Sequence, residues 1–367
     1  MTKIYILDYI GIHCGMHYYN AVFKELLAEI PNVSIKILSN YADGDRTKPF
    51  LKNFYRRNKL LGAIILFYDF LKLFVKRLTE PKAEFIVLSY GNPIDLIFIF
   101  IACMVARHTV VDIHEAVAQD AEHKRWLVAM YRFLYAHCVK TVIVHPERSR
   151  TFMRQFGFKG GELYVPHFKY ALKKDYDAAN LADDVRNAIS DGKTNILFFG
   201  NLTYNKGVDI LLDAYLSLAE SDKQRLNIIV SGRDLDGTVG KSDVGDEKNV
   251  HLILRHINDD ELIYLYGNTD FIALPYRKTS QSGILEMAFY FRKPIVASRI
   301  EYFELMLGRF PSFGILTDFS VAEYAGTLAD LPQYDIKEFY KSDEYDRYCN
   351  RKEMAEFVEE FKRYLHK

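Results

Sequence analysis

Two kinds of apolar pattern alternate along this chain. Short, nearly continuous apolar runs are typical of strands that are buried on both faces of a parallel sheet. They predict strands at Lys3–Leu7, Val33–Leu38, Phe85–Ser89, Thr109–Ile113, Thr141–Val144, Leu163–Val165, Asn195–Phe199, Leu226–Val230, Val250–Leu254 and Asp270–Leu274. Apolar residues spaced by three or four positions predict helices at Tyr19–Ile30, Pro93–Ala106, Trp126–His137, Arg148–Phe156, Val208–Leu218, Asp259–Tyr266 and Asp346–His366. This alternation predicts an α/β fold with parallel sheets.

The series of strands and helices is interrupted by a polar and charged stretch at about residues 170–194. A chain of 367 residues is long enough for two domains that each have a hydrophobic core. We therefore predict a first domain over residues 1–172, a second over residues 173–344 and a helical C-terminal segment over residues 345–367.

Composition argues against several classes of protein. Charged residues make up 26% and hydrophobic residues 49%, as in ordinary globular proteins. The four cysteines are scattered, which argues against structural zinc and for reduced thiols in the cytoplasm. We expect no signal peptide and no nucleic-acid partner. We also expect no transmembrane segment, because the longest apolar runs, Leu60–Tyr68 and Leu96–Ala106, fall short of the roughly 18–20 residues that span a bilayer.

Charge is distributed unevenly. Residues 1–172 hold 23 Lys and Arg against 15 Asp and Glu, and the remaining residues hold 25 against 33. The basic and aromatic stretch Phe50–Leu78 has one acidic residue, Asp69, and two interpretations. Either this stretch makes peripheral contact with an anionic membrane, or it forms an amphipathic helix that covers the sheet. The pattern favours the covering helix for Leu60–Val75 and membrane contact for Phe50–Lys59.

Loops after predicted strands supply candidate ligand contacts in the first domain. Gly11 and Gly15 lie in the first such loop and allow close backbone approach, and His13 and His17 there are candidate acceptor contacts. His114 ends a predicted strand, where a parallel sheet places its ligands. A structural role for His114 stays open.

The stretch 275–298 reads as loop, helix and strand. Its small polar loop, Thr279–Gly283, runs into an apolar helix, so unpaired amides and the positive end of the helix dipole are available to an anion. A Ser-capped surface helix is the alternative. Lys206, in the loop before another helix, can neutralise phosphate charge at the same edge of the sheet, and Arg233 is a second cation.

Four segments in combination resemble the retaining GT-B glycosyltransferases of family four, in the branch for bacterial capsule, O-antigen and exopolysaccharide assembly. The segments are Phe198-Phe-Gly-Asn-Leu-x-x-x-Lys206-Gly-Val-Asp-x-Leu-Leu-x-Ala, Ala273-Leu-Pro-Tyr-Arg, Gln281-Ser-Gly and Lys293-Pro-Ile-Val-Ala-Ser298. The resemblance implies two Rossmann-like, doubly wound domains facing a cleft. The first would bind the acceptor and the second the nucleotide sugar, without a catalytic metal, and the C-terminal helix would cross back to the first domain.

The resemblance also implies roles for single residues. Lys206 matches the phosphate-binding lysine, His114 the histidine near the transferred sugar, and Gly15 the glycine whose backbone approaches the diphosphate. The predicted donor-binding set is Gly15, Asn201, Arg233, Thr279, Ser280, Gln281, Ser282, Gly283 and Glu286.

The sequence departs from the family pattern at three positions. Asn201 stands where many members have arginine, and Thr279 and Met287 occupy the positions of two glutamates. Glu286 is one residue out of register, a rotation of about 100° on a helix. The ribose ligand is therefore left open.

We predict an enzyme that moves a sugar from a nucleotide diphosphate, UDP or GDP, to a lipid-linked or glycan acceptor with retention of configuration. It would need no cofactor and would work in the cytoplasm, with peripheral membrane contact through Phe50–Leu78. Two alternatives remain, namely a sugar-nucleotide epimerase or hydrolase on the same fold, and a non-catalytic nucleotide-sugar-binding subunit.

Overall fold

In the computed structural model the chain divides into two compact units. Unit 1 comprises Met1–Ala171 and Arg351–Lys367, and unit 2 comprises Leu172–Asn350. The structure describes residues 1–13, 16–43, 48–54, 58–115, 124–145, 156–165, 175–279, 282–349 and 352–366.

Unit 1 is built on a six-stranded parallel sheet with the order β2-β1-β3-β4-β5-β6. Its strands are β1 (Thr2–Asp8), β2 (Val33–Ser39), β3 (Glu84–Tyr90), β4 (Thr109–Glu115), β5 (Thr141–Val144) and β6 (Gly161–Tyr164). Its helices are α1 (Met16–Ala28), α2 (Lys59–Thr79), α3 (Pro93–Ala102), α4 (Arg125–His137) and α14 (Lys352–Leu365). Six of the predicted strands are thus present, because continuous apolar runs can be buried on both faces of a parallel sheet.

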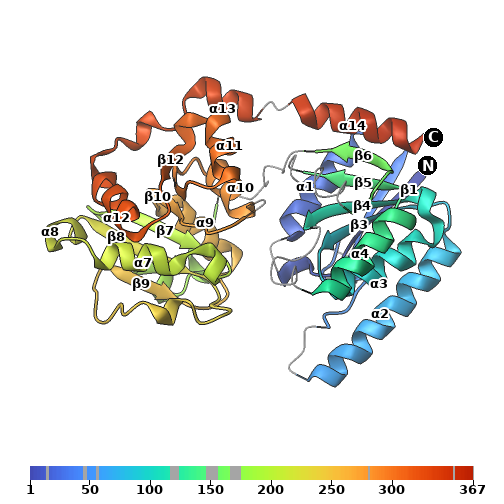
Figure 1. The fold of residues 1–367 in the computed structure, drawn as a ribbon, viewed down its shortest axis with the longest axis horizontal. Coiled ribbons are helices and arrows are strands. Elements are labelled where there is room, and N and C mark those ends of the chain that lie inside the picture. Colours follow the sequence, from blue (N-terminus) through green and yellow to red (C-terminus); the bar gives the residue numbers. More distant parts are fainter. Residues whose placement is uncertain are drawn as a thin grey trace. The chain divides into compact units, whose positions relative to one another are not determined.

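Alternation along the strands divides the core of unit 1 between the two faces of the sheet. Tyr5, Leu7, Phe85 and Val87 belong to one hydrophobic cluster that also contains residues of α2, α3 and α4. Figure 1 shows these three helices along one face of the sheet, with α3 in contact with both α2 and α4. Within the described residues, none of the helices combines the length and the apolarity needed to cross a membrane.

Unit 2 contains a second six-stranded parallel sheet with the order β12-β11-β10-β7-β8-β9. Its strands are β7 (Thr194–Phe199), β8 (Leu226–Ser231), β9 (Val250–Ile253), β10 (Phe271–Leu274), β11 (Ile295–Ser298) and β12 (Gly314–Thr317). Its helices are α6 (Asp183–Arg186), α7 (Val208–Leu216), α8 (Glu220–Lys223), α9 (Asp259–Asn268), α10 (Gly283–Tyr290), α11 (Glu301–Arg309), α12 (Val321–Asp330) and α13 (Ser342–Cys349). Since β7 lies between β10 and β8, the loops that follow these three strands are neighbours.

The prediction of one helix over Asp346–His366 is wrong, because this stretch takes part in two helices that belong to different units. Tyr345 and Tyr348 of α13 pack with Phe313 of unit 2. Phe357 of α14 instead packs on Phe23 of α1. The apolar residues of the stretch thus serve two separate cores, which a single helical pattern does not reveal. Most of the predicted helix Arg148–Phe156 lies outside the described residues.

Candidate functional site

The loops after β7 and β8 are held together by their backbones. Gly232 has a φ of 140°, and a Cβ at this position would lie 1.8 Å from the carbonyl oxygen of Gly200. Beyond these glycines the amide of Leu202 donates to the carbonyl of Arg233 at 2.8 Å, and the amide of Leu235 donates back to Leu202 at 3.0 Å. The exposed side chains of Asn201 and Arg233 therefore sit on adjacent, fixed backbones.

The loops after β7 and β10 are also joined. A Cβ on Gly207, which has a φ of 69°, would lie 1.9 Å from the carbonyl oxygen of Pro275. The guanidinium of Arg277 donates to both carboxylate oxygens of Asp209 at 2.7 Å and to the carbonyl of Tyr204 at 2.6 Å. Such a bidentate, part-buried ion pair fixes geometry as well as charge.

Lys206 is positioned by this junction. It ends a short 3-10 helix, Tyr204–Lys206, and its Nζ lies 4.0 Å from the centre of the Tyr276 ring. Among the residues that the structure describes, neither Lys206 nor Arg233 has an acidic partner. Two cations are therefore uncompensated at the carboxyl edge of this sheet, whereas the third, Arg277, is neutralised by Asp209.

The start of α10 adds amide donors to these cations. A Cβ on Gly200 would lie 3.3 Å from the side chain of Ile284, so the loop after β7 packs on the first turn of this helix. Ser282 is the N-cap, and its Oγ accepts from the amide of Leu285 at 3.3 Å. No residue in the described part of the chain accepts from the amides of Gly283 or Ile284. An anion at this turn would find two unpaired N–H groups and the positive end of a helix dipole.

The predicted donor contacts thus have different surroundings. The side chain of Ser282 is buried, and its hydroxyl caps the helix. The backbone amide of Ser282 donates to the Tyr302 hydroxyl at 3.3 Å. Thr279 is also buried, and Ser280 and Gln281 lie outside the described residues. Of the described residues of this loop, Gly283 therefore offers an unpaired backbone amide, whereas the side chains of Thr279 and Ser282 are buried.

Glu286 lies inside unit 2 and is only 1% exposed. Its Oε2 accepts a hydrogen bond of 2.6 Å from the hydroxyl of Tyr348 on α13. Tyr348 in turn packs against Phe289, Phe310 and Phe313. One carboxylate oxygen of this predicted donor contact is therefore committed to a partner inside the unit.

The second group of candidate residues lies at the carboxyl edge of the sheet in unit 1. Asp112 and His114 are on β4, and His145 follows β5. The Nε2 of His145 lies 2.7 Å from Oδ1 of Asp112, and Tyr19 on α1 donates to Oδ2 at 2.7 Å. The His114 ring stacks near Tyr90 and contacts Tyr19 edge-on.

The ring of His145 lies between two oxygen atoms. Its Nδ1 faces the carbonyl oxygen of Val165 at 3.1 Å, while its Nε2 faces Asp112. These two contacts fix the orientation of the ring beside Asp112. Burial alone would raise the pKa of Asp112, but the nearby His145 and His114 rings hold it well below its usual value.

Asp112, His114 and His145 also offer ligand atoms within 4.8 Å of one another. In the part of the chain that the structure describes, this is the one group with the spacing to hold a metal ion. The 2.7 Å contact between Asp112 and His145 is a hydrogen bond, so metal binding would require this bond to open.

The loop after β1 is tied to the same region. Asp8 accepts from the amide of Gly11 at 3.0 Å and from the hydroxyl of Tyr90 at 2.7 Å. The Tyr90 ring stacks on that of His114, so one buried carboxylate connects this loop to the predicted catalytic histidine. His17 on α1 packs against Tyr18 and Tyr41, whereas the side chain of His13 and all of Gly15 lie outside the described residues.

Sequence reasoning assigned no role to several residues that build these sites. Tyr276, Arg277 and Asp209 position Lys206, and His145 holds Asp112. The available signal was the position of Tyr276, Arg277 and His145 close behind predicted strands, whereas Asp209 lies in the predicted helix that follows the Lys206 loop. Their pairing depends on the strand order, which the sequence pattern did not supply.

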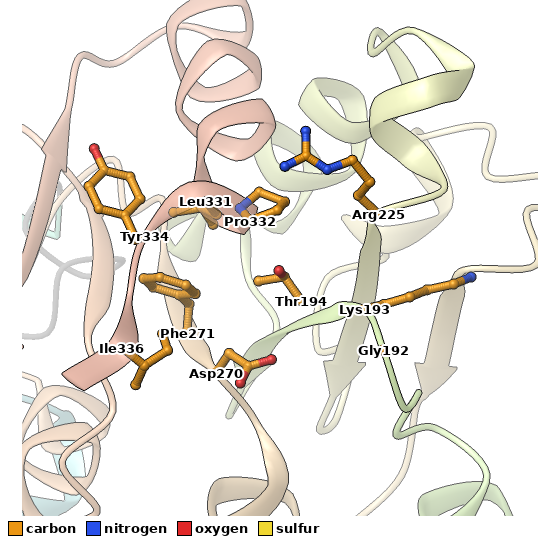
Figure 2. Close-up of a pocket in the computed structure, with 10 residues that line it drawn as sticks. All are labelled: Gly192, Lys193, Thr194, Arg225, Asp270, Phe271, Leu331, Pro332, Tyr334 and Ile336. Atoms are coloured by element: carbon orange, nitrogen blue, oxygen red, sulfur yellow. The ribbon is translucent and has the colours of Figure 1, made fainter. Parts of the chain in front are cut away.

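The pocket in Figure 2 lies elsewhere. It has a volume of about 400 Å³ and is lined by Gly192, Lys193, Thr194, Arg225, Asp270, Phe271, Leu331, Pro332, Tyr334 and Ile336. Thr194 begins β7 and Phe271 begins β10. The pocket is therefore at the amino ends of these strands, the opposite edge from the loop that carries Lys206.

Two six-stranded parallel sheets, each flanked by helices, define the GT-B class of fold, and solved structures match the chain over its length. Sucrose-phosphate synthase from Thermosynechococcus elongatus superposes with a TM-score of 0.71 at 14% identity, over 100% of this chain and 99% of that chain. HepE from Anabaena, in complex with UDP and glucose, gives 0.66 at 16% identity over 100% of both chains. WaaG, a glycosyltransferase involved in lipopolysaccharide biosynthesis, gives 0.65 at 13% identity over 98% of both. At these identities the likeness shows the fold.

Part of unit 2 also matches the sequence model of a protein family. Residues 193–331 match the sequence model of the family described as "Glycosyl transferases group 1". A comparison with curated proteins finds no match. The matched residues lie within unit 2 and include the loop that carries Lys206 and the helix α10.

Proposed function

We propose that this protein is a retaining, metal-independent glycosyltransferase that moves a sugar from a nucleotide diphosphate to an acceptor hydroxyl. One observation carries the proposal. Within the matched domain, the Lys206 loop packs against both the loop after β10 and the first turn of α10. Uncompensated cations and unpaired amides thus meet at the edge where an α/β sheet binds its ligands.

The reaction uses this charge directly. As the anomeric C–O bond to the diphosphate breaks, negative charge builds on the departing phosphate oxygen. Lys206, Arg233 and the amides of Gly283 and Ile284 stabilise that charge. The acceptor oxygen bonds to the same face of the sugar, and the acceptor's proton passes to the departing phosphate oxygen.

Unit 2 would bind the donor, and unit 1 the acceptor through His13 and His17. The donor backbone contacts would include Gly15, and His114 would contact the transferred sugar, held in place by Asp112, His145 and Tyr90. HepE has been seen with UDP-glucose, which favours a uridine diphosphate donor for this chain. The role of WaaG in lipopolysaccharide biosynthesis supports a lipid-linked or glycan acceptor in surface polysaccharide assembly.

The test is a transfer assay with UDP-, GDP- and ADP-sugars, lipid-linked and oligosaccharide acceptors, and EDTA. We expect transfer from a UDP-sugar, unaffected by EDTA, with the donor's anomeric configuration retained in the product by NMR. Donor breakdown or epimerisation that is independent of acceptor would instead indicate a hydrolase or an epimerase. Donor binding without turnover would indicate a non-catalytic subunit.

Lys206→Ala tests the site itself. We expect transfer to fall by about two orders of magnitude, the scale of losing one stabiliser of transition-state charge. Lys337→Ala is the matched control, since Lys337 is an exposed lysine of the same unit outside these loops. Full activity in Lys206→Ala would remove the phosphate role.

A further inference from the structure

The helix α2 is apolar on its outward side as well as on its inward side. Inward, it buries Leu73 together with two charged residues, Asp69 and Arg77, which hydrogen-bond to backbone partners. Asp69 accepts from the amide of Lys52 at 3.0 Å and 3.1 Å, and Arg77 donates to the carbonyls of Ala83 and Val105 at 2.7 Å. Its outward side exposes large apolar residues at helical spacing, namely Leu60, Leu61, Ile64, Phe67, Tyr68, Leu71, Phe74, Val75 and Leu78.

The same apolar surface continues over the neighbouring helices. Ile97 and Phe100 of α3, with Met104 beyond it, form one exposed stripe, and Trp126, Met130 and Phe133 of α4 form another. Because α3 contacts both α2 and α4, the three helices form one layer along the sheet (Figure 1), and their exposed side chains lie on the outer side of this layer. Phe67 is 70% exposed, Phe100 59% and Trp126 56%. Contiguous exposed apolar residues on this scale mark an interaction surface.

The charges on this face have one sign. On the described helices α2, α3 and α4 (residues 59–79, 93–102 and 125–137), the exposed charged side chains are Lys59, Arg125 and Arg132, all basic. The acidic residues of these segments, Asp69 and Asp95, are buried. A symmetric contact between two copies would bring these cations together without acidic partners. An anionic bilayer instead accepts the apolar side chains at its interface and pairs with the cations.

We propose that the outward face of α2, α3 and α4 docks onto the surface of an anionic lipid bilayer. The contact differs from the one that the sequence favours, because Phe50 and Phe54 pack against the core of unit 1 and Lys72 donates to the carbonyl of Phe50. The docking residues are Leu60–Leu78 and the stripes on α3 and α4. This surface is independent of the donor site in unit 2 and does not rest on the proposed reaction.

Vesicle flotation of the full chain tests the docking face. We expect the wild-type protein to float with vesicles of phosphatidylcholine and phosphatidylglycerol, and much less with phosphatidylcholine alone. Phe67→Glu combined with Leu71→Glu should lower binding at least about tenfold, the loss expected when one large apolar side chain stays in water. Phe100→Glu and Trp126→Glu should each lower it as well. Leu305→Glu, at a 61% exposed leucine of unit 2, is the matched control and should float like wild type.

Circular dichroism should show native folding in every variant, since the replaced side chains are exposed. Equal flotation with both vesicle types would overturn the anionic-lipid proposal, and so would full binding by the Phe67 and Leu71 double variant. A wild-type dimer that does not float and becomes monomeric in this double variant would assign the face to a second copy and overturn the proposal. Donor binding, measured in parallel without vesicles, reports on unit 2 separately.

Discussion

Gly207 connects the two loops that position Lys206. Its φ of 69° and the 1.9 Å approach of the Pro275 carbonyl to a Cβ position leave no room for a side chain. We predict that Gly207→Ala lowers the free energy of unfolding by about 1–3 kcal/mol. Gly240 has open space around its Cβ position, so Gly240→Ala should be neutral within about 0.5 kcal/mol. Urea denaturation compares the two, and equal stabilities would contradict the assigned loop contact.

Two fully buried aspartates of unit 1 should respond to pH in opposite directions. Burial raises the pKa of Asp95, although the hydroxyls of Tyr9 and Tyr131, the amide of Tyr90 and the hydroxyl of Ser89 act to lower it. Burial acts to raise the pKa of Asp112 as well, but its interactions with the His145 and His114 rings lower it overall. The difference lies in these imidazole partners, because hydroxyl donors do not neutralise a buried carboxylate.

The sign of each effect follows from proton linkage. Asp112 contributes stability above the ordinary aspartate pKa of about 4, and this is lost as pH falls below it. Asp112→Asn should therefore lower the free energy of unfolding by about 3–5 kcal/mol near neutral pH, and by progressively less in acid. Asp95 contributes stability that is lost as pH rises above about 4. The free energy of unfolding of Asp95→Asn should therefore increase relative to that of the wild type as pH rises. Urea unfolding of both variants as a function of pH provides the measurement, and parallel curves would contradict the assignment.

At the scale of elements, substitutions at the start of α10 can distinguish helix capping from anion binding. Proline is tolerated at the first position of a helix and lacks an N–H. The preceding residue, Ser282, already has the extended backbone that proline favours. Gly283→Pro should therefore keep the helix but weaken donor binding by about tenfold or more, as one hydrogen bond to a charged group is lost.

Ser282→Ala should show the opposite profile. It removes the cap and should cost about 1 kcal/mol of stability, with little change in donor affinity. Isothermal titration with UDP-sugars and thermal unfolding measure both quantities. A large affinity loss in Ser282→Ala with none in Gly283→Pro would assign the anion to the serine side chain.

On the scale of the whole molecule, each unit has its own buried aromatic residues. Phe361 of α14 is fully buried in unit 1, and Phe303 of α11 is fully buried in unit 2. We predict that each Phe→Ala change costs about 3–5 kcal/mol and lowers the thermal transition of its own unit. Calorimetry should then show Phe361→Ala and Phe303→Ala shifting different transitions. A common shift of one cooperative transition would show that the units unfold together.

The sequence predicted the strands well because a buried parallel strand needs an apolar run, which is a local feature. The runs around Phe85 and Ile196 therefore appear in the structure as strands. Lys206 and the loop before α10 were likewise predicted from local pattern, since each lies in a segment that follows a predicted strand. Lys206, Tyr276 and the Arg277–Asp209 pair meet only because β10 lies next to β7.

The sequence by itself determined the α/β class, two series of strands and the placement of basic and small residues at their carboxyl ends. The tertiary structure decided which of these residues meet, and which side of each helix is buried. The helix α2 shows the reason. It has apolar residues on both its inward and its outward side, and Asp69 and Arg77 are buried because their partners, the backbones of Lys52 and Ala83, lie on the inward side. Those partners come from other parts of the chain, so only the folded unit decides which apolar residues of α2 face outward.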